Sequence, residues 1–231
     1  MQRRVEPEWL DEMPPDDPRA VRCRRDLRLM NRIMGHGRMI EHALRGNVRA
    51  RRPRIAELGG GDGTLMLHVA RALNEPGGGE LTLVDQQPVV SPETEALYAQ
   101  RSWRTAVRAA DVFDWLAEAQ ADYDAIVANL FLHHFEPPQI AKLFTLAALR
   151  TPLFVACEPR RARLPLIGSR LVGLLGCNDV TRHDAVLSVR AGFNDRELSD
   201  LWPADGRWQL EETSAGLFSH RFVARSVSRE D

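Results

Sequence analysis

Cysteine, lysine and long apolar runs are all scarce in this sequence. Of its 231 residues, three are cysteines (Cys23, Cys157 and Cys177), and none of them forms a CxxC pair. That spacing excludes both a disulfide framework and a zinc knuckle. No apolar run reaches the roughly 20 residues that a membrane span requires, and the first residues lack the apolar core of a signal peptide. We therefore expect a reduced, cytoplasmic protein with no membrane span.

Charge of either sign is nearly balanced, and Lys142 is the only lysine. The formal net charge is −1, which gives no overall electrostatic reason to expect nucleic acid or an anionic membrane as a partner. The length and the 44% hydrophobic content are sufficient for one large α/β domain with a substantial core, or for two small domains.

Short apolar segments alternate with helix-like segments along most of the chain. The expected strands are residues 54–58, 81–85, 105–109, 124–129, 153–157, 208–213 and 219–227. Alternation of strand and helix predicts a parallel sheet with helices on both faces. The last two strands are joined through a short turn at Ser214-Ala215-Gly216, and so short a connection requires an antiparallel pair. The sequence therefore predicts an α/β fold with a doubly wound, mostly parallel seven-stranded sheet and an antiparallel C-terminal hairpin.

Three regions follow one another along the chain. Residues 1–17 are polar and proline-rich, and we expect them to be flexible. Residues 18–48 have helical periodicity that is interrupted near Gly35 and ends near Gly46, which predicts a helical lid or cap. Residues 49–231 then contain the predicted sheet.

A long insertion at residues 159–193 separates the fifth strand from the hairpin. Insertions of this length usually form lids or substrate walls. An apolar helix is expected at residues 164–175, and a charged cluster follows at Arg182, His183, Asp184 and Arg190. The cluster either binds a carboxylate or carbonyl group of a substrate, or forms a salt-bridge network that secures the lid. A short helix is expected at residues 194–201.

The segment Glu57-Leu58-Gly59-Gly60-Gly61-Asp62-Gly63 connects the first strand to a helix. Glycines there allow the backbone to approach a ligand closely at a helix N-terminus. A dinucleotide fingerprint places its third glycine one residue later, where this chain has Thr64. A carboxylate at Glu57 suits a cationic amino group and is unhelpful against a pyrophosphate. The spacing therefore favours a ligand with an ammonium group.

Two further carboxylates follow the next two strands. Asp85 ends the second strand, where a carboxylate can accept hydrogen bonds from both ribose hydroxyls. Asp111 follows the third strand, where a carboxylate can accept the adenine amino group, although a helix N-cap is an equal alternative for this residue.

These residues together resemble the class I S-adenosylmethionine-dependent methyltransferases, from about residue 50 to the C-terminus and including the hairpin. The segments 31–35 and 184–193 are similar to those of a small bacterial group like the ubiquinone-biosynthesis enzymes, some of which modify polyketide-derived phenols. The resemblance implies S-adenosylmethionine as the cofactor. It also implies a set of cofactor-binding residues: Glu57, Gly59, Gly60, Gly61 and Gly63 at the methionine portion, Asp85 and Gln86 at the ribose, Asp111 and Val112 at the adenine, and Asn129 and Leu130 near the methyl group.

Two adjacent histidines, His133 and His134, follow the fourth strand at the edge where such folds bind ligands. His133 falls where similar small-molecule O-methyltransferases carry a catalytic histidine, and His134 stands where those enzymes often have an aspartate. A histidine can remove the proton of a phenol as a general base. The alternative is that either histidine merely packs beneath the cofactor. Adjacent histidines tend to point apart, so we expect no metal site.

The predicted function is methyl transfer from S-adenosylmethionine to an oxygen, or with less support a carbon, of a small aromatic or polyketide-like acceptor. One alternative is an RNA or protein methyltransferase, although Asn129 is followed by Leu130-Phe131 and not by an amino-methylating Pro-Pro-Tyr motif. Another is a non-catalytic module of the same fold that binds the cofactor or a partner chain. The sequence predicts no nucleic-acid partner and leaves the oligomeric state open, a homodimer being one alternative.

Overall fold

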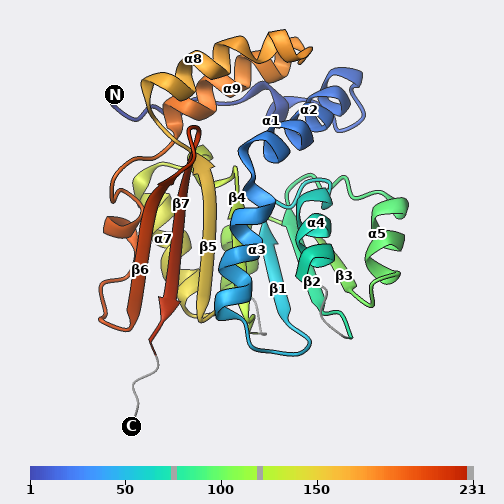
Figure 1. Cartoon of the computed structure of the whole chain (residues 1–231), viewed down its shortest axis with the longest axis vertical. Coiled ribbons are helices and arrows are strands. Elements are labelled where there is room, and N and C mark those ends of the chain that lie inside the picture. Colours follow the sequence, from blue (N-terminus) through green and yellow to red (C-terminus); the bar gives the residue numbers. More distant parts are fainter. Residues whose placement is uncertain (74–76, 119–121, 228–231) are drawn as a thin grey trace.

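The computed structural model describes residues 1–73, 77–118 and 122–227, and a seven-stranded sheet runs through its middle (Figure 1). The strand order is β3-β2-β1-β4-β5-β7-β6. The strands are β1 (Arg54–Leu58), β2 (Glu80–Asp85), β3 (Arg104–Ala109), β4 (Ala125–Asn129), β5 (Leu153–Pro159), β6 (Trp208–Ala215) and β7 (Ser219–Ser226). The last four residues of the predicted domain, 228–231, lie outside the described residues.

Strands β1 to β5 are parallel, and β7 is antiparallel to both of its neighbours, β5 and β6. Every residue of β4 and β5 is buried, as expected for central strands of a sheet that is covered on both faces. Leu58 of β1 pairs with Val84 on one side and Ala128 on the other. This register brings the carboxyl ends of the central strands to one edge of the sheet. The predicted fold class is confirmed.

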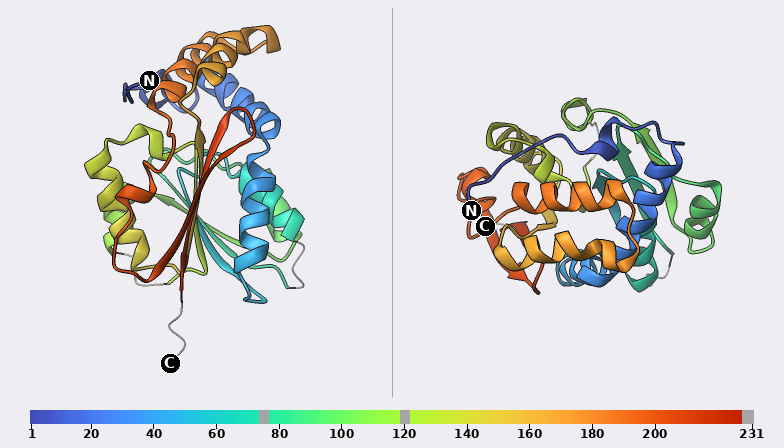
Figure 2. Two further views of the ribbon diagram at one scale, coloured as in Figure 1. Left: turned by 60° about the vertical axis from the view of Figure 1, so that its left-hand side comes forward. Right: turned by 90° about the horizontal axis from the view of Figure 1, so that it is seen from above.

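Helices cover both faces of the sheet (Figure 2). On one face α3 (His36–Asn47), α4 (Thr64–Leu73) and α5 (Pro92–Ala99) pack on a core that includes Ile40, Met66 and Tyr98. On the other face α6 (Val112–Glu118), α7 (Pro137–Ala148) and the segment around the 3-10 turn η3 (Ser199–Leu201) pack on a core that contains Phe144 and Trp202. Both cores are apolar, so burial on each face holds the sheet in the middle layer.

A third group of helices lies above the carboxyl ends of the strands (Figure 1). It consists of α1 (Trp9–Glu12), α2 (Pro18–Met34), α8 (Arg163–Leu171), the 3-10 helix η2 (Val172–Leu175) and α9 (Asp179–Ala191). Helix α2 begins where the Asp17 carboxylate accepts the Arg19 N–H and ends at Gly35, whose φ is 74°, the conformation that favours glycine at a helix end. The layer roofs the edge of the sheet at which ligands bind in α/β folds.

Several expectations from the sequence differ from the structure. The cap predicted for residues 18–48 is divided: α2 belongs to the roof, whereas α3 packs in the core through Ile40, Ala43 and Leu44. Gly46 lies inside α3 and does not end it. The apolar helix expected at residues 164–175 changes to 3-10 geometry at Val172.

The helix predicted for residues 194–201 is wrong, because the structure contains only the 3-10 turn η3 there. Side chains replace helical hydrogen bonds in this segment. The Glu212 carboxylate accepts the N–H groups of Leu198 and Ser199, and Glu197 accepts the N–H of Asn194. Since these backbone donors are already satisfied, a regular helix offers no gain.

The N-terminal 17 residues, for which composition predicts flexibility, make specific contacts with the roof and the sheet edge. The Arg3 guanidinium donates to the carbonyl of Phe135 at 2.8 Å. The N–H groups of Trp9 and Leu10 donate to the carboxylate of Asp184 at 3.0 and 3.1 Å. We call residues 1–17 the strap. Phe135 and Asp184 lie more than a hundred positions away from it, so local composition does not reveal these contacts.

Candidate active site

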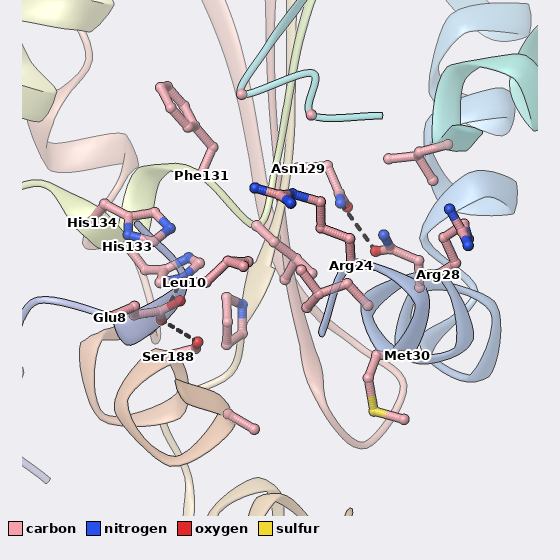
Figure 3. A pocket seen from close by; sticks show the side chains of 18 of the residues that line it. Glu8, Leu10, Arg24, Arg28, Met30, Asn129, Phe131, His133, His134 and Ser188 are labelled. Atoms are coloured by element: carbon pink, nitrogen blue, oxygen red, sulfur yellow. Dashed lines mark hydrogen bonds and ion pairs between the residues drawn. The ribbon is translucent and has the colours of Figure 1, made fainter. Parts of the chain in front are cut away.

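A cavity of about 530 Å³ lies between the carboxyl edge of the sheet and the helical roof. Figure 3 shows that residues from the strap, α2 and the β4 end all point into it. Its lining is polar near the ends of β1 and β2, where Glu57 and Asp85 lie, and apolar beneath the roof. The apolar part is formed by Leu27, Met30, Met34, Phe131, Phe135, Val172 and Val189, among others.

The glycine-rich turn forms the floor of the polar part. Gly59, Gly61 and Gly63 have φ values of 70°, 50° and 70°, which side chains other than glycine rarely adopt. The N–H groups of Gly59 and Gly60 both donate to the carbonyl of Val84. Gly59, Gly60 and Gly61 line the cavity, whereas Gly63 lies beneath it and accepts the Tyr98 hydroxyl at 2.6 Å. The turn thus presents bare backbone to the cavity.

Glu57 is the most unusual group on this floor. Its side chain is buried, it lines the cavity, and its Oε2 atom has no hydrogen-bond partner among the described residues. Burial, together with the nearby carboxylates of Asp62 and Asp85, raises the pKa of Glu57 well above its ordinary value. A buried carboxylate with an unused oxygen is stabilised by a cation. Glu57 therefore fits a ligand that carries an ammonium group.

Asp85 and Gln86 lie on the cavity wall at the end of β2, as the predicted ribose site requires. The Asp85 carboxylate accepts the N–H of Gly61 at 2.9 Å and that of Gln87 at 2.8 Å. These two bonds hold the carboxylate against the glycine turn. The second lone pairs of its oxygens are available to hydroxyl groups.

Asp111 differs from its neighbours because its carboxylate is used within the fold. One oxygen accepts the N–H of Phe113 at 2.8 Å, at the start of α6, and the other accepts the Gln86 amide at 3.1 Å. The wall of the cavity here is made by Ala110 and Val112, with no contribution from Asp111. The geometry is that of the helix N-cap, the alternative that the sequence left open.

Asn129 lies at the end of β4 and is held by a network from the first helices. Its Oδ1 lies 2.6 Å from Nδ1 of His36, and its Nδ2 donates to Asn31 at 3.0 Å. Because a carboxamide oxygen only accepts, Nδ1 of His36 carries a proton, and Nε2 accepts the Ser219 hydroxyl at 2.7 Å. Complete burial lowers the pKa of His36 to about 4. A neutral His36 thus fixes the Asn129 amide on the cavity wall.

The backbone next to Asn129 is strained. Leu130 has a φ of 49°, a left-handed conformation that is uncommon for a residue with a side chain and is frequently found at functional sites. Its N–H donates to the carbonyl of Cys157 at 2.9 Å. Like Asn129, Leu130 lines the cavity.

His133 is buried between two carboxylates. Its Nδ1 lies 2.7 Å from Oε2 of Glu158, and its Nε2 lies 3.4 Å from Oε1 of Glu8. Burial alone would lower the pKa of His133, but hydrogen bonds to the two glutamates outweigh it and raise the pKa to about 10. His133 is therefore an imidazolium at neutral pH, with both ring nitrogens engaged. It lacks the free lone pair that a general base needs.

Glu158 connects this cluster to the backbone of the β4 loop. Its Oε1 accepts the N–H groups of Phe131 and Leu132 at 3.0 and 2.8 Å, while its Oε2 faces His133. Burial by itself would raise the pKa of Glu158. The hydrogen bonds from His133 and from this backbone lower the pKa by more than burial raises it, so the pKa lies below its ordinary value. The carboxylate is charged and fully paired. It holds the 3-10 turn η1 (Leu132–His134) in place.

His134 differs from His133 in both exposure and partners. A quarter of its side chain is exposed, and its Nδ1 lies 3.2 Å from Oδ2 of Asp11 in the strap. It lines the cavity. The cluster of Glu8, His133 and His134 offers ligand atoms within 4.8 Å of one another, but a cation there would have to displace the contact between Glu8 and His133. That no metal is bound stays a prediction.

Sequence patterns did not indicate Glu8, Asp11 or His36 as site residues. Glu8 and Asp11 fall in the strap, and the one local signal was the apolar pair Trp9-Leu10 within a polar stretch. The charged cluster of the insertion serves the same strap. Asp184 accepts two N–H groups at the start of α1, and the ring of His183 stacks on Trp9 at 3.8 Å. This geometry is that of the network that secures the lid.

Residues 55–149 match a family model described as a methyltransferase domain. The seven-stranded order of the sheet agrees with that description. The chain contains a methyltransferase domain. The buried, unpaired oxygen of Glu57 fits the ammonium group of S-adenosylmethionine, the cofactor that the sequence predicts.

Solved structures of other methyltransferases share the fold. The plantazolicin methyltransferase BamL, in complex with a triazolic desmethylPZN analog and SAH, is 12% identical with a TM-score of 0.65, over 94% of this chain and 92% of that one. Magnesium protoporphyrin IX methyltransferase from Synechocystis PCC 6803 with bound SAH is 13% identical with a TM-score of 0.52, over 84% and 83%. The pyocyanin biosynthetic protein PhzM is 17% identical with a TM-score of 0.60, over 95% of this chain and 61% of that one.

A comparison of this sequence with curated proteins found no match. Of the helices in residues 1–73, 77–118 and 122–227, none combines the length and apolar character needed to cross a membrane.

Proposed function

We propose that this methyltransferase transfers the methyl group to an oxygen of a small aromatic or polyketide-like acceptor, with His134 as the general base. The observation that carries the proposal is the cavity itself. One part of the cavity presents Glu57 and Asp85. The other part is mostly apolar, and the partly exposed side chain of His134 on its wall can contact a bound ligand. Carbon methylation of the same acceptor is the second candidate.

The cofactor would lie along the ends of β1, β2 and β4. Glu57 would receive its ammonium group, the Gly59–Gly61 backbone its methionine portion, and Asp85 with Gln86 its ribose. Val112 would border the adenine, and Asn129 with Leu130 the methyl group. Bound in this way, S-adenosylmethionine supplies an electrophilic methyl group at the boundary between the polar and apolar parts.

The apolar chamber would hold the acceptor ring against Phe131, Met30 and Met34. Aromatic rings bind well to such surfaces, and methionine adapts its shape to them. Asp11 engages Nδ1 of His134, which leaves Nε2 to take the hydroxyl proton as the oxygen bonds to the methyl carbon. Orientation of the acceptor by the cavity walls would supply much of the acceleration of a displacement of this kind.

The sequence placed the general base at His133, whereas the proposal assigns that role to His134. His133 is a positioning residue that ties the strap to the β4 loop, because its two contacts hold Glu8 and Glu158. His134 takes the place proposed for the base. RNA or protein as an acceptor has less support, since the strap and roof cover the reaction centre.

The experiment measures S-adenosylhomocysteine formation with a panel of phenols and hydroxylated polyketide-like acceptors, and identifies the product by NMR. We expect O-methylated products, and we expect His134→Ala to lower kcat by roughly a hundredfold or more without weakening cofactor binding. His42→Ala, at an exposed position on α3, is the matched control. Wild-type turnover in His134→Ala would overturn the base assignment. Cofactor binding without methylation of any phenol would overturn the acceptor class.

A further inference from the structure

Helix α8 and the following turn η2 are apolar on their outer surface as well as on their inner one. Pro165, Ser169 and Val172 face the cavity. The outward side chains are more than half exposed, and Leu174 is 83% exposed. This outer surface, which we call the roof face, consists of Leu164, Ile167, Leu171, Leu174 and Leu175.

The roof face lies on the outermost element of the molecule. In Figures 1 and 2, α8 runs across the end of the protein opposite the C-terminus, beside α9. A contiguous apolar surface of this kind usually marks a binding surface.

The segment that carries the roof face contains charge of a single sign. Residues 159–178 contain four arginines and no aspartate or glutamate. Arg163 and Arg170 are exposed on α8 itself, and Arg182 is exposed on α9. Although the whole protein is nearly neutral, this segment is basic, and the acid that follows it, Asp179 at the start of α9, is paired with Arg19. Exposed aliphatic side chains with flanking arginines are typical of helices that lie in the plane of an anionic bilayer.

The cavity opens at the edge of the roof face. Leu175 of η2 and Ile33 of α2 both line the cavity and are more than half exposed. These two residues therefore form a rim at which the apolar interior meets the apolar outer surface. An acceptor that leaves a bilayer at this rim would cross little water before it reaches His134.

We propose that the roof face docks on an anionic lipid bilayer and that the acceptor enters the cavity from the lipid between Ile33 and Leu175. The route of the acceptor rests on the proposed function, whereas the docking itself does not. A second copy of this chain is a poorer occupant. A two-fold pairing of roof faces would bring Arg163 and Arg170 of both copies together without an acidic partner on the face.

The docking experiment is sedimentation of the full chain with vesicles. The vesicles are phosphatidylcholine alone or phosphatidylcholine mixed with phosphatidylglycerol, each at low and high salt. We expect binding to the mixed vesicles at low salt, and weaker binding with phosphatidylcholine alone or at high salt. Failure to bind either vesicle at low salt overturns the proposal.

Two variants separate the apolar and charged contributions. The triple variant Ile167→Ser, Leu171→Ser, Leu174→Ser should weaken binding to mixed vesicles by about tenfold or more. Arg163→Gln with Arg170→Gln should weaken it mainly at low salt. The matched control is Leu149→Ser at the end of α7, a leucine of comparable exposure outside the roof face. Wild-type binding by the triple variant overturns the proposal, as does a dimer in light scattering that this variant converts to a monomer.

Activity distinguishes a failure of the docking surface from a failure of the proposed function. None of the three substituted residues lines the cavity, so the triple variant should methylate a water-soluble phenol at the wild-type rate while losing activity on an acceptor embedded in vesicles. Vesicle binding without any phenol methylation would support docking and overturn the acceptor class. Equal losses on both acceptors would overturn the entry route.

Discussion

Nδ1 of His133 lies 2.7 Å from Oε2 of Glu158, and both side chains are buried, the glutamate completely. The contact joins the loop after β4 to the end of β5, and Glu8 extends it to the strap. Because the charges are paired inside the protein, His133 is a cation in the folded state. The same ring in water would be largely neutral at pH 7.

The His133 cluster should make stability depend on pH in a specific direction. The pKa of His133 is raised from 6.5 to about 10 in the folded protein, so its contribution is fully present below pH 6.5 and is lost as pH rises towards 10. The pKa values of Glu8 and Glu158 are lowered from 4.5, so their contributions are lost as pH falls below that value. We therefore expect the contribution of this cluster to the free energy of unfolding to be greatest between about pH 4.5 and pH 6.5. Urea titration at a series of pH values measures it.

Replacement of His133 provides the check on that profile. His133→Asn leaves two buried carboxylates without their cation and should destabilise the protein by about 3–5 kcal/mol near neutral pH. It should also remove the alkaline decline. His42→Asn, at an exposed position on α3, should preserve both the stability and the profile. An alkaline decline that is the same in His133→Asn and wild type would contradict the imidazolium assignment.

Glu57→Gln should weaken S-adenosylmethionine binding by roughly tenfold to a hundredfold, the usual contribution of a hydrogen bond to a charged group. Since the raised pKa favours a neutral carboxyl in the free protein, an ammonium group would drive out its proton on binding. Wild-type affinity should therefore increase with pH. Calorimetry in buffers of different ionisation enthalpy should detect proton release in wild type and none from residue 57 in the variant.

Glu80→Gln is the control for that measurement, because Glu80 starts β2 and its side chain is half exposed beside Arg54. It should bind the cofactor as wild type does. If Glu57→Gln and Glu80→Gln bind equally well, Glu57 has no role at the ammonium group.

Gly59→Ala and Gly61→Ala should have different consequences despite their similar backbone. Both positions have positive φ, so an alanine costs about 1 kcal/mol at each. A Cβ at Gly59 would come within 2.4 Å of Cδ2 of Phe131, whereas a Cβ at Gly61 would meet no atom within 4 Å. We expect Gly59→Ala to lower the free energy of unfolding well beyond 1 kcal/mol, because Phe131 must move.

Gly61→Ala should leave stability within about 1 kcal/mol of wild type but reduce cofactor affinity, since Gly61 lines the cavity. Urea denaturation and calorimetry on the same samples separate the two effects. Undiminished cofactor affinity in Gly61→Ala would show that the cofactor does not approach this part of the turn.

Asp184→Ala should release the strap. The carboxylate accepts the N–H groups of Trp9 and Leu10, so its loss resembles the loss of a helix cap, about 1–2 kcal/mol. Limited trypsin digestion should cut the first 25 residues faster in this variant, and kcat should fall because Asp11 loses its position at His134. Asp200→Ala, at an exposed position in η3, should digest like wild type. Equal digestion of all three proteins would argue against a docked strap.

Local patterns were sufficient for the sheet and for the glycine-rich turn. The apolar segments that became β4 and β5 are buried on both faces, and burial of this kind leaves a continuous apolar run in the sequence. The short connection between the last two strands, residues 216–218 in the structure, could only join antiparallel strands. The glycines at 59, 61 and 63 all have positive φ, a backbone requirement that the spacing alone indicates.

Patterns failed where a residue's role depends on a distant partner. For Asp111 the sequence left a ligand contact and a helix N-cap equally open, and the structure shows that it caps α6 while Asp85 faces the cavity. The composition of residues 1–17 predicted flexibility. It carries no information about Asp184, which binds the strap from more than 170 positions away.

The sequence by itself determined the order of strands and helices, the glycine turn and the carboxylate at Glu57, because each depends on hydrophobic period or backbone conformation within a few residues. Tertiary structure alone decided the protonation of His133. Its charge depends on Glu8 and Glu158, which lie 125 and 25 positions away and come within 3.4 and 2.7 Å only after folding. A pKa is a property of the surrounding charges and solvent, and folding is what assembles those surroundings.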